Sequence, residues 1–312
     1  MALGSNQVTT TTAATFIPEV WSDEIVAAYK KNLVAANLFK KMSFVGKKGD
    51  TVHIPSPTRG TASLKAANSQ VALQAATEGD VAVTIDKHYE YSRLIEDIVE
   101  VQALSSLRRF YTDDAGYALA KQVDTSLIQL GRTFNGGSGA TYSGAYIGGD
   151  GTTAYNSTTS NASALTDAAI RRTIQRLDDN DTPMDGRFFI IPPSSRNTLM
   201  GLSRYTEQAF VGNGNAIRTG EIGNLYGIPV FTSSNADTGA GNTATDRICL
   251  MGHKDAMVLV EQVGIRSQTQ YKQDYLATLF TSDTLYGVSA LRSAATTGEA
   301  LSSSMFALVV PS

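Results

Sequence analysis

Three histidines, His53, His88 and His253, are the side chains of this chain best suited to acid-base chemistry or metal binding near neutral pH. They stand in separate predicted elements, and none has the spacing of a metal-ligand pair or lies beside a plausible nucleophile. His53 and His88 could face each other across two strands of a hairpin, and we interpret such a pair as a cross-strand contact. The histidines therefore indicate neither a metal site nor a catalytic centre.

Two groups of charged side chains could also do chemistry. In the stretch EDIVE, helical spacing would place Glu96 and Glu100 on one face as an acid and base pair. Arg171, Arg172 and Arg176 share a predicted helix and could contact phosphates. We interpret both groups as solvated polar faces, the usual place for charged side chains.

Two glycine-rich stretches and one cysteine are the remaining candidates for a functional site. Residues 212–223, GNGNAIRTGEIG, follow no predicted strand and lack the Gly-Lys-Ser/Thr of a phosphate-binding loop. Residues 148–153, GGDGTT, lack the further Asp or Asn positions and the closing Glu of a calcium loop. Cys249 is the only cysteine, so no intramolecular disulfide can form, and its apolar surroundings predict a buried side chain. The sequence thus predicts no catalytic residue, no metal site and no cofactor.

Composition indicates a folded globular protein with a surface of low charge, which suits coverage by neighbouring molecules. The chain has 312 residues, of which 42% are hydrophobic and 18% charged, and the charged share is below the average of roughly 25%. A net charge of −3 argues against binding nucleic acid through a general excess of positive charge, but leaves a local basic face open. No signal peptide or membrane span is recognisable, so we expect a cytosolic protein unless it leaves in a larger particle.

The elements that would position these side chains include an unusual hairpin over residues 49–86. Val81, Val83 and Ile85 alternate with polar residues, which predicts a half-buried strand. The stretch between the two predicted strands is small and polar, with little that could anchor a core. Because a lone hairpin is marginally stable in water, we expect that something outside the chain holds it.

The other elements follow in a clear order. Residues 1–16 predict a flexible arm, and a helical pattern begins at Pro18. The longest helical pattern, Leu104 to Gly131, would form a rod of about 40 Å. Residues 135–163 are rich in Gly, Ser and Thr and predict a long surface loop or a weak hairpin. An alternation of helices and strands follows, with Thr166 as a helix N-cap, the buried strand RFFIIPP, the short helix SSRNTLMGL and several further strands.

Several segments carry a resemblance to a known family. In order along nearly the whole chain, segments of this sequence resemble those of the major capsid proteins of tailed bacteriophages (Caudovirales). The segments are FIPEVWSDEIVAAYKKNLVAANL, GKKGDTVHIPSP, VTIDKHYEYSRLIEDIVEVQA, YALAKQVDTSLIQLG, RFFIIPPSSRNTLMGL, GNLYGIPVFTSSNA and GHKDAMVLVEQ.

The resemblance implies an α+β chain with the Hong Kong 97-type capsid fold. Its parts would be an N-terminal arm with a helix, an extended β-hairpin loop over the neighbouring subunit, a peripheral domain with a spine helix, an axial domain, and strands that return to the peripheral domain. The corresponding residues are 1–48, 49–88, 89–134, 135–264 and 265–312.

The implied function is structural. Many copies would self-assemble as hexamers and pentamers of an icosahedral virion shell around double-stranded DNA, with nonspecific DNA contacts and no membrane or enzymatic role. The folded pattern begins by about residue 18, so a separate scaffolding protein is expected, beside a portal. The glycine-rich residues 135–163 could meet a decoration protein. Synthesis would take place in the host cytoplasm.

Assembly contacts are predicted on the arm and on the hairpin loop. Some relatives join a loop lysine to an asparagine of another subunit, but no acidic residue is identified beside Lys65, so we expect no such crosslink. The residues predicted to make assembly contacts are Trp21, Arg59, Lys65, Asn68 and Gln70.

Two other functions remain open at this point. An encapsulin-type bacterial compartment shares the implied fold and would enclose an enzyme cargo. An enzyme with an α/β core would explain the alternation of elements after residue 165, although no catalytic set accompanies it.

Overall fold

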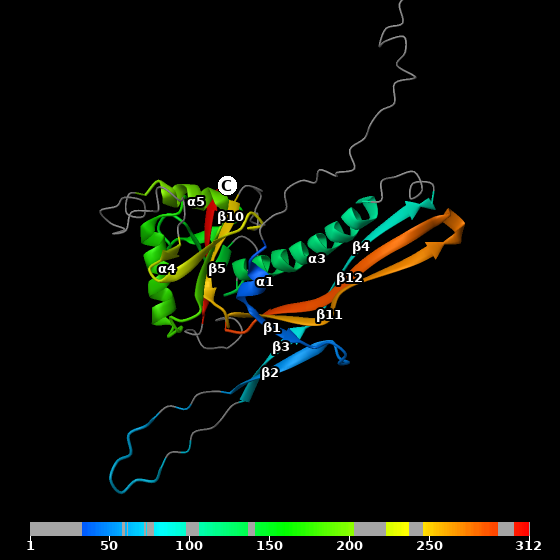
Figure 1. The fold of residues 1–312 in the computed structure, drawn as a ribbon. Coiled ribbons are helices and arrows are strands. Elements are labelled where there is room, and N and C mark those ends of the chain that lie inside the picture. The colour runs from blue at the N-terminus through cyan, green and yellow to red at the C-terminus, as the bar shows by residue number, and fades with distance from the viewer. Residues whose placement is uncertain are drawn as a thin grey trace, which may run out of the picture.

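The chain folds around two sheets that meet at one long helix, with a hairpin beside the smaller sheet (Figure 1). The structure is a computed structural model. It describes residues 33–57, 60, 62–71, 73, 78–97, 106–136, 141–202, 223–236, 246–292 and 303–311.

The smaller sheet has four strands in the order β1-β11-β12-β4. β11 and β12 form a long antiparallel pair, β4 adds antiparallel to β12, and β1 adds parallel to β11 at the opposite edge. The turn between β11 and β12 is a short 3-10 helix, η2. Figure 1 shows this sheet reaching away from the rest of the molecule beside helix α3. The bounds are β1 Lys40–Ser43, β4 Lys87–Glu96, β11 Met257–Lys272, η2 Gln273–Tyr275, β12 Ala277–Ala290 and α3 Ser106–Arg132.

The larger sheet has seven strands in the order β6-β5-β13-β10-β7-β9-β8. Helices α4 and α5 cover one face, where their apolar side chains form a cluster with alternate residues of the central strands. Helix α1 and the inner half of α3 cover the other face. The bounds are β5 Thr141–Ile147, β6 Ala154–Asn156, β7 Arg187–Ile191, β8 Asn224–Leu225, β9 Ile228–Thr232, β10 Asp246–His253, β13 Met305–Pro311, α1 Ala35–Leu38, α4 Asp167–Asp179 and α5 Pro193–Met200.

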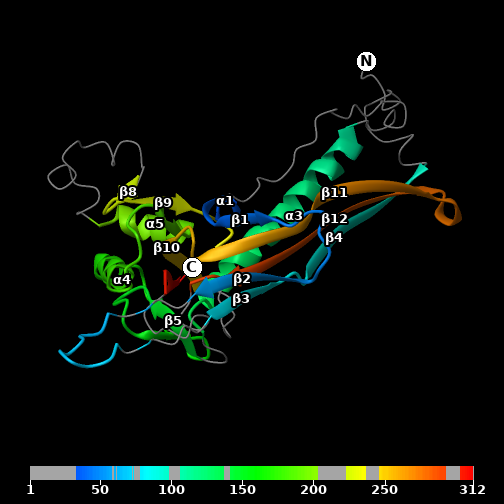
Figure 2. The same ribbon diagram turned by 90° about the horizontal axis from the view of Figure 1, so that it is seen from below.

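Strands β2 (Thr51–Pro57) and β3 (Glu78–Thr84) form the hairpin. Its inner end, where Thr51 pairs with Thr84, packs against the smaller sheet, and we call this end the hairpin root. Figure 2 shows the molecule from below, which is the side on which the hairpin lies against β11 and β12. Val83 and Ile85 are buried against Val258 and Val260 of β11. The approach is close at Gly287, where an added Cβ would collide with the backbone around Thr84. The chain itself therefore anchors the hairpin root, which corrects the expectation that only an outside partner could do so.

Several sequence expectations are confirmed. The long helix is α3, within two residues of its predicted bounds. Thr166 caps α4, since its side chain accepts a hydrogen bond from the backbone N–H of Ala169. Every residue of β7 is buried. Cys249 is fully buried, and burial raises the pKa of its thiol to about 12, so it behaves as a small apolar residue.

The predicted contact between His53 and His88 is wrong. β2 pairs with β3, so His53 lies opposite Ala82 and its ring contacts the carboxylate of Asp80. His88 belongs to β4 in the smaller sheet, where it contacts Asp283. The chain leaves the hairpin after Thr84, two residues earlier than the pattern indicated, and His88 is thereby placed in another sheet.

Of the two structures predicted for the glycine-rich stretch, the hairpin is confirmed and the surface loop is not, since β5 pairs antiparallel with β6. β5 pairs in parallel with β13, β6 extends the same sheet, and Tyr155 of β6 is fully buried. The Tyr155 hydroxyl donates to the buried carboxylate of Asp246, 2.7 Å away. Small residues here permit close packing, as at Gly148, where a Cβ would strike Val310. Composition alone did not predict that this hairpin belongs to the larger sheet, because a strand buried beside glycines has little hydrophobic pattern.

Two further expectations meet the structure only in part. Residues 265–312, predicted to return together to the peripheral domain, divide between the sheets, because β12 lies in the smaller and β13 in the larger. Of the helix predicted from Pro18, residues 18–32 lie outside the described residues, and within the described part only α1 is helical.

Candidate assembly interface

The loop at the end of the hairpin has no core of its own to pack against. Every described residue between 60 and 73 is exposed. Leu64 is 100% exposed, Leu73 is 95% exposed and Val71 is 64% exposed. These exposed apolar side chains make the loop a candidate contact surface, since full burial of a side chain of this size contributes about 1.5–3 kcal/mol.

The loop nevertheless carries a defined turn at its end. The backbone N–H and the hydroxyl of Ser69 both donate to the carbonyl oxygen of Ala66, and Asn68 has a φ of 60°. Asn tolerates this left-handed conformation better than most residues. The turn presents Lys65 and Gln70, also exposed, on either side of it.

A second candidate surface is one face of the smaller sheet. The hydroxyls of Tyr286 in β12 and Ser126 in α3 lie 2.9 Å apart, so the even-numbered residues of β12 face the helix. The odd-numbered residues face away, and the hairpin root covers this side near Gly287. Farther out, it is uncovered in the described part of the chain. We call this part the open face; it comprises His88, Glu90, Ser92, Arg266, Gln268, Gln270, Thr281 and Asp283.

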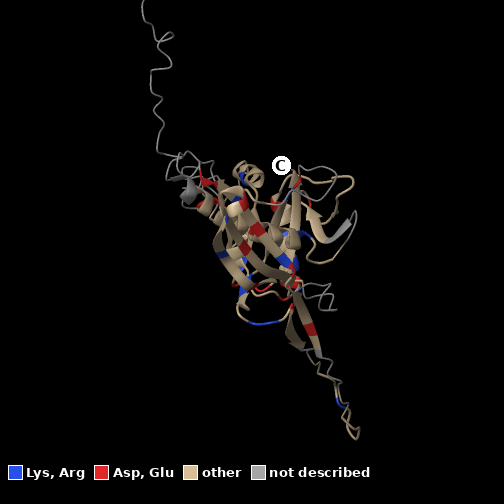
Figure 3. Ribbon diagram, turned by 90° about the vertical axis from the view of Figure 1, so that its right-hand side faces the viewer, with Lys and Arg blue, Asp and Glu red and all other residues tan. Residues whose placement is uncertain are grey.

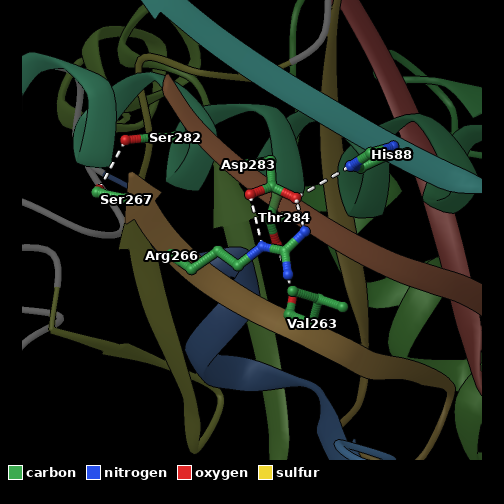
Figure 4. A network of polar contacts seen from close by, with 7 residues as sticks. All are labelled: His88, Val263, Arg266, Ser267, Ser282, Asp283 and Thr284. Carbon is green, nitrogen blue, oxygen red and sulfur yellow. Dashed lines mark hydrogen bonds and ion pairs between the residues drawn. The ribbon is translucent and has the colours of Figure 1, made fainter. Parts of the chain in front are cut away.

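An ionic network organises the open face (Figure 4). The guanidinium of Arg266 holds the carboxylate of Asp283 through two hydrogen bonds of 2.8 and 2.9 Å, and His88 lies 3.1 Å from the same carboxylate. The Arg266 hydrogen bond lowers the pKa of Asp283 below its ordinary value. The three side chains come from three neighbouring strands, so they fix a charged pattern across the sheet.

The network stands beside an irregular part of β11. The register with β12 shifts between Glu261 and Val263 and again before Arg266. The hydroxyl of Thr284 donates to the carbonyl oxygen of Val263 at 3.1 Å, so a side-chain hydrogen bond joins β12 to the irregular part of β11 (Figure 4). The bulge therefore decides that Arg266 lies opposite Asp283.

A buried carboxylate joins the N-terminal part of the chain to the body. Asp124 of α3 is fully buried and accepts hydrogen bonds from the backbone N–H groups of Ala35, at 2.7 Å, and Ala36, at 3.4 Å. It also accepts one from the side-chain amide of Asn235 at 3.1 Å. A helix as short as α1 is not stable alone, so Asp124 acts as its cap from another element.

The predicted contact residues divide by location. Lys65, Asn68 and Gln70 lie together on the exposed loop, whereas Trp21 and Arg59 lie outside the described residues. Sequence reasoning missed Leu64 and Leu73, although apolar residues in a small, polar stretch were a usable signal. It also missed Arg266 and Asp283, because their pairing depends on a bulge.

Other kinds of site have little support in the part of the chain that the structure describes. It contains no group of three or more His, Cys, Asp or Glu side chains placed to hold a metal. None of its helices is long and apolar enough to cross a membrane. Arg176 is half-buried and stacks on the ring of Tyr146, 3.5 Å from its centroid, so it serves packing rather than phosphate binding.

Comparisons with known proteins agree with one another. A family model described as phage capsid protein matches residues 80–288. A structure from Mycobacterium phage Che8 is 25% identical, with a TM-score of 0.72, and the match covers 95% of this chain and 97% of that chain.

Two other solved structures extend the comparison. The capsid structure of cyanophage P-SCSP1u is 18% identical, with a TM-score of 0.74 and coverage of 99% of this chain and 96% of that chain. The acidic stable capsid of Helicobacter pylori bacteriophage KHP30 is 12% identical, with a TM-score of 0.70 and coverage of 99% and 100%. Comparison with curated proteins gives no match.

Proposed function

The chain belongs to the phage capsid protein family and is a major capsid protein, and from this premise we propose that its copies form hexamers and pentamers of an icosahedral shell around double-stranded DNA. The observation that carries the proposal is the hairpin loop, whose Leu64 and Leu73 are exposed and are not covered by any part of the subunit that the structure describes. In a shell, a neighbouring copy would bury them.

We further propose that the loop of one subunit lies over the smaller sheet of the next. The loop supplies exposed leucines and the polar residues Lys65, Asn68 and Gln70. The open face supplies side chains of both charges and two amides, Gln268 and Gln270. Such pairing across subunits repeats over a closed shell, so even a modest free energy for each contact yields a stable particle. Trp21 and Arg59 would add contacts from the arm and loop.

The remaining assignments follow from the same proposal. The role would be structural and not enzymatic. A separate scaffolding protein, a portal and a decoration protein would be partners, and contacts with DNA would be nonspecific. The proposed parts are the arm 1–48, loop 49–88, peripheral domain 89–134, axial domain 135–264 and return segment 265–312, with β13 contributing to the larger sheet. Synthesis would precede assembly in the host cytoplasm. Neither an encapsulin-type compartment nor an α/β enzyme is favoured.

The proposal is tested by replacing residues 60–76 with a short turn. The β2–β3 root stays anchored through Val83 and Ile85, so we expect a folded, soluble subunit that fails to form stable shells. Negative-stain electron microscopy and size-exclusion chromatography, with and without a coexpressed scaffolding protein, would measure assembly.

A matched variant separates loop length from loop chemistry. Replacing residues 60–76 by a Gly/Ser sequence of equal length keeps the reach of the loop but removes its side chains. We expect this variant to fail as well. Intact shells from the shortened protein would refute the role proposed for the loop, and a wild-type protein that stays monomeric under all conditions would refute the shell itself.

A further inference from the structure

Positive charge is concentrated in one short part of the chain. Between Glu24 and Asp50 there is no acidic residue, yet this run holds six lysines, more than half of the eleven in the chain. The other residues contain 20 Lys and Arg against 29 Asp and Glu. A segregated run of one charge points to a charged partner.

The structure places four of these lysines together. Lys40 and Lys41 lie on β1, the edge strand of the smaller sheet, and Lys47 and Lys48 lie in the turn that follows it. All four are exposed. In Figure 3, this turn stands out in blue at the side of the molecule. We call Lys40, Lys41, Lys47 and Lys48 the lysine strip.

The charge of the strip is not neutralised by the described residues around it. None of the ion pairs in the described part of the chain involves these four side chains. The ammonium of Lys41 contacts the amide oxygen of Asn37 at 3.5 Å, and that of Lys47 lies 5.1 Å from the ring centroid of Phe44. Both contacts leave the positive charge intact and available.

Protection of a sheet edge explains only part of the pattern. Lysines on edge strands deter unwanted pairing with another chain, and Lys40 and Lys41 could serve this purpose. Lys47 and Lys48 lie beyond the strand, around a turn with Gly46 at a φ of 79°, and have no strand edge to protect. Edge protection therefore does not account for these two lysines.

We propose that the lysine strip binds the phosphate backbone of the packaged double-stranded DNA. Lysine ammonium groups are compact point charges that suit phosphates without reading bases. The rest of the chain carries an excess of acidic residues and would repel DNA, so contact would be confined to the strip. This inference rests on the proposed function and adds which surface faces the genome.

The first test measures DNA binding by unassembled subunits. The Lys47→Gln/Lys48→Gln variant is compared with wild type by fluorescence anisotropy of a short, mixed-sequence duplex over about 50 to 200 mM salt. We expect weaker binding and a salt dependence whose log–log slope is smaller by about 2, since each phosphate contact contributes about 0.9.

The matched control is Lys121→Gln/Lys272→Gln, which removes the same charge from α3 and β11. We expect this control to keep the wild-type slope. Equal changes of slope in the two variants would overturn the proposal, because they would show that only the net charge of the subunit matters. An unchanged slope for Lys47→Gln/Lys48→Gln would overturn it as well.

The second test uses assembled particles. Amine-reactive labelling of Lys47 and Lys48, read by mass spectrometry, is compared between empty and DNA-filled shells. Protection only in filled shells is expected. Equal protection in both would assign the strip to a protein contact, such as a neighbouring subunit, and overturn the DNA assignment while leaving the shell function intact. Failure of wild type to form shells would instead refute the proposed function.

Discussion

At the scale of single residues, Asp124 decides how the N-terminal part of the chain joins the body. Its carboxylate links α1, α3 and the segment after β9, because Ala35 and Asn235 both donate to it. A buried carboxylate with several donors is stabilising only while all of them remain in place. The loss of Asp124 should therefore destabilise three segments at once.

Substituting Asp124 by Ala should destabilise the unassembled subunit by about 2–4 kcal/mol, because two buried donors lose their acceptor. Urea unfolding would measure the loss, and hydrogen exchange at residues 33–38 should speed up. The Asp124→Asn variant keeps one acceptor oxygen and should lose less. Unchanged exchange at Ala35 in the Ala variant would contradict the capping role.

The pH dependence of Asp124 has a definite sign. Burial raises the pKa of its carboxyl, while the hydrogen bonds from Asn235, Ala35 and Ala36 oppose the rise. A folded-state pKa above the unfolded value of about 3.9 means that its stabilisation is complete below that value and is lost as pH rises through the folded pKa.

The free energy of unfolding of wild type, relative to Asp124→Asn, should therefore fall as pH increases above about 3.9 and then level off. Chemical unfolding of both proteins at a series of pH values measures the difference. If the difference in unfolding free energy grew with pH, the hydrogen bonds would lower the pKa of Asp124 by more than burial raises it.

At the scale of elements, the hairpin combines an anchored root with an unanchored loop. The root packs Val83 and Ile85 against β11 and passes close to Gly287 of β12. The loop exposes Leu64 and Leu73. The two parts should therefore respond to substitution in different ways.

Replacing Gly287 by Ala should destabilise the subunit by about 1–3 kcal/mol, because the new methyl group overpacks the contact with Thr84. Gly264 of β11 is a matched control, since an added Cβ there would meet no atom within 4 Å. Thermal unfolding of both variants measures the effect. Equal melting temperatures for the Gly287 and Gly264 variants would contradict the close packing of the hairpin root.

Replacing Leu64 and Leu73 by Ser should act only on assembly. Neither side chain is buried in the subunit, so the free energy of unfolding should change by less than about 0.5 kcal/mol. Shell yield should fall sharply, and light scattering would follow it. Met184→Ser, which changes another exposed apolar residue, is the control. Normal shells from the loop variant would contradict burial of these leucines by a neighbour.

At the scale of the whole molecule, assembly should supply part of the stability. The smaller sheet reaches away from the larger one, its open face is uncovered in the described part of the chain, and the hairpin loop is exposed (Figure 1). In the proposed shell, these surfaces gain partners when copies associate. Folding and association are then thermodynamically linked, as for any species that binds the native state alone.

We therefore expect the melting temperature of assembled shells to exceed that of isolated subunits. Under conditions of reversible assembly, it should also rise with protein concentration. Differential scanning calorimetry at several concentrations would measure both effects. The subunit with residues 60–76 replaced serves as the control, and its melting temperature should not depend on concentration. A wild-type melting temperature equal to that of this control would argue against the linkage.

The sequence by itself determined features that depend on near neighbours. Four such features were predictable, because each follows from residues a few positions apart. They are the helical spacing of apolar residues in α3, the cap at Thr166, the alternation at Val81, Val83 and Ile85, and the burial of Cys249. The order of such segments also indicated the family.

Only the tertiary structure decided which distant segments meet. Asp124 and Asn235 are far apart in the chain, and a bulge sets Arg266 opposite Asp283. Sheet order likewise placed the glycine-rich β5 beside β13 and His88 beside Asp283. The physical reason is that strand pairing and register are fixed by packing over the whole chain, and a shift of one residue would turn every side chain of a strand to the other face.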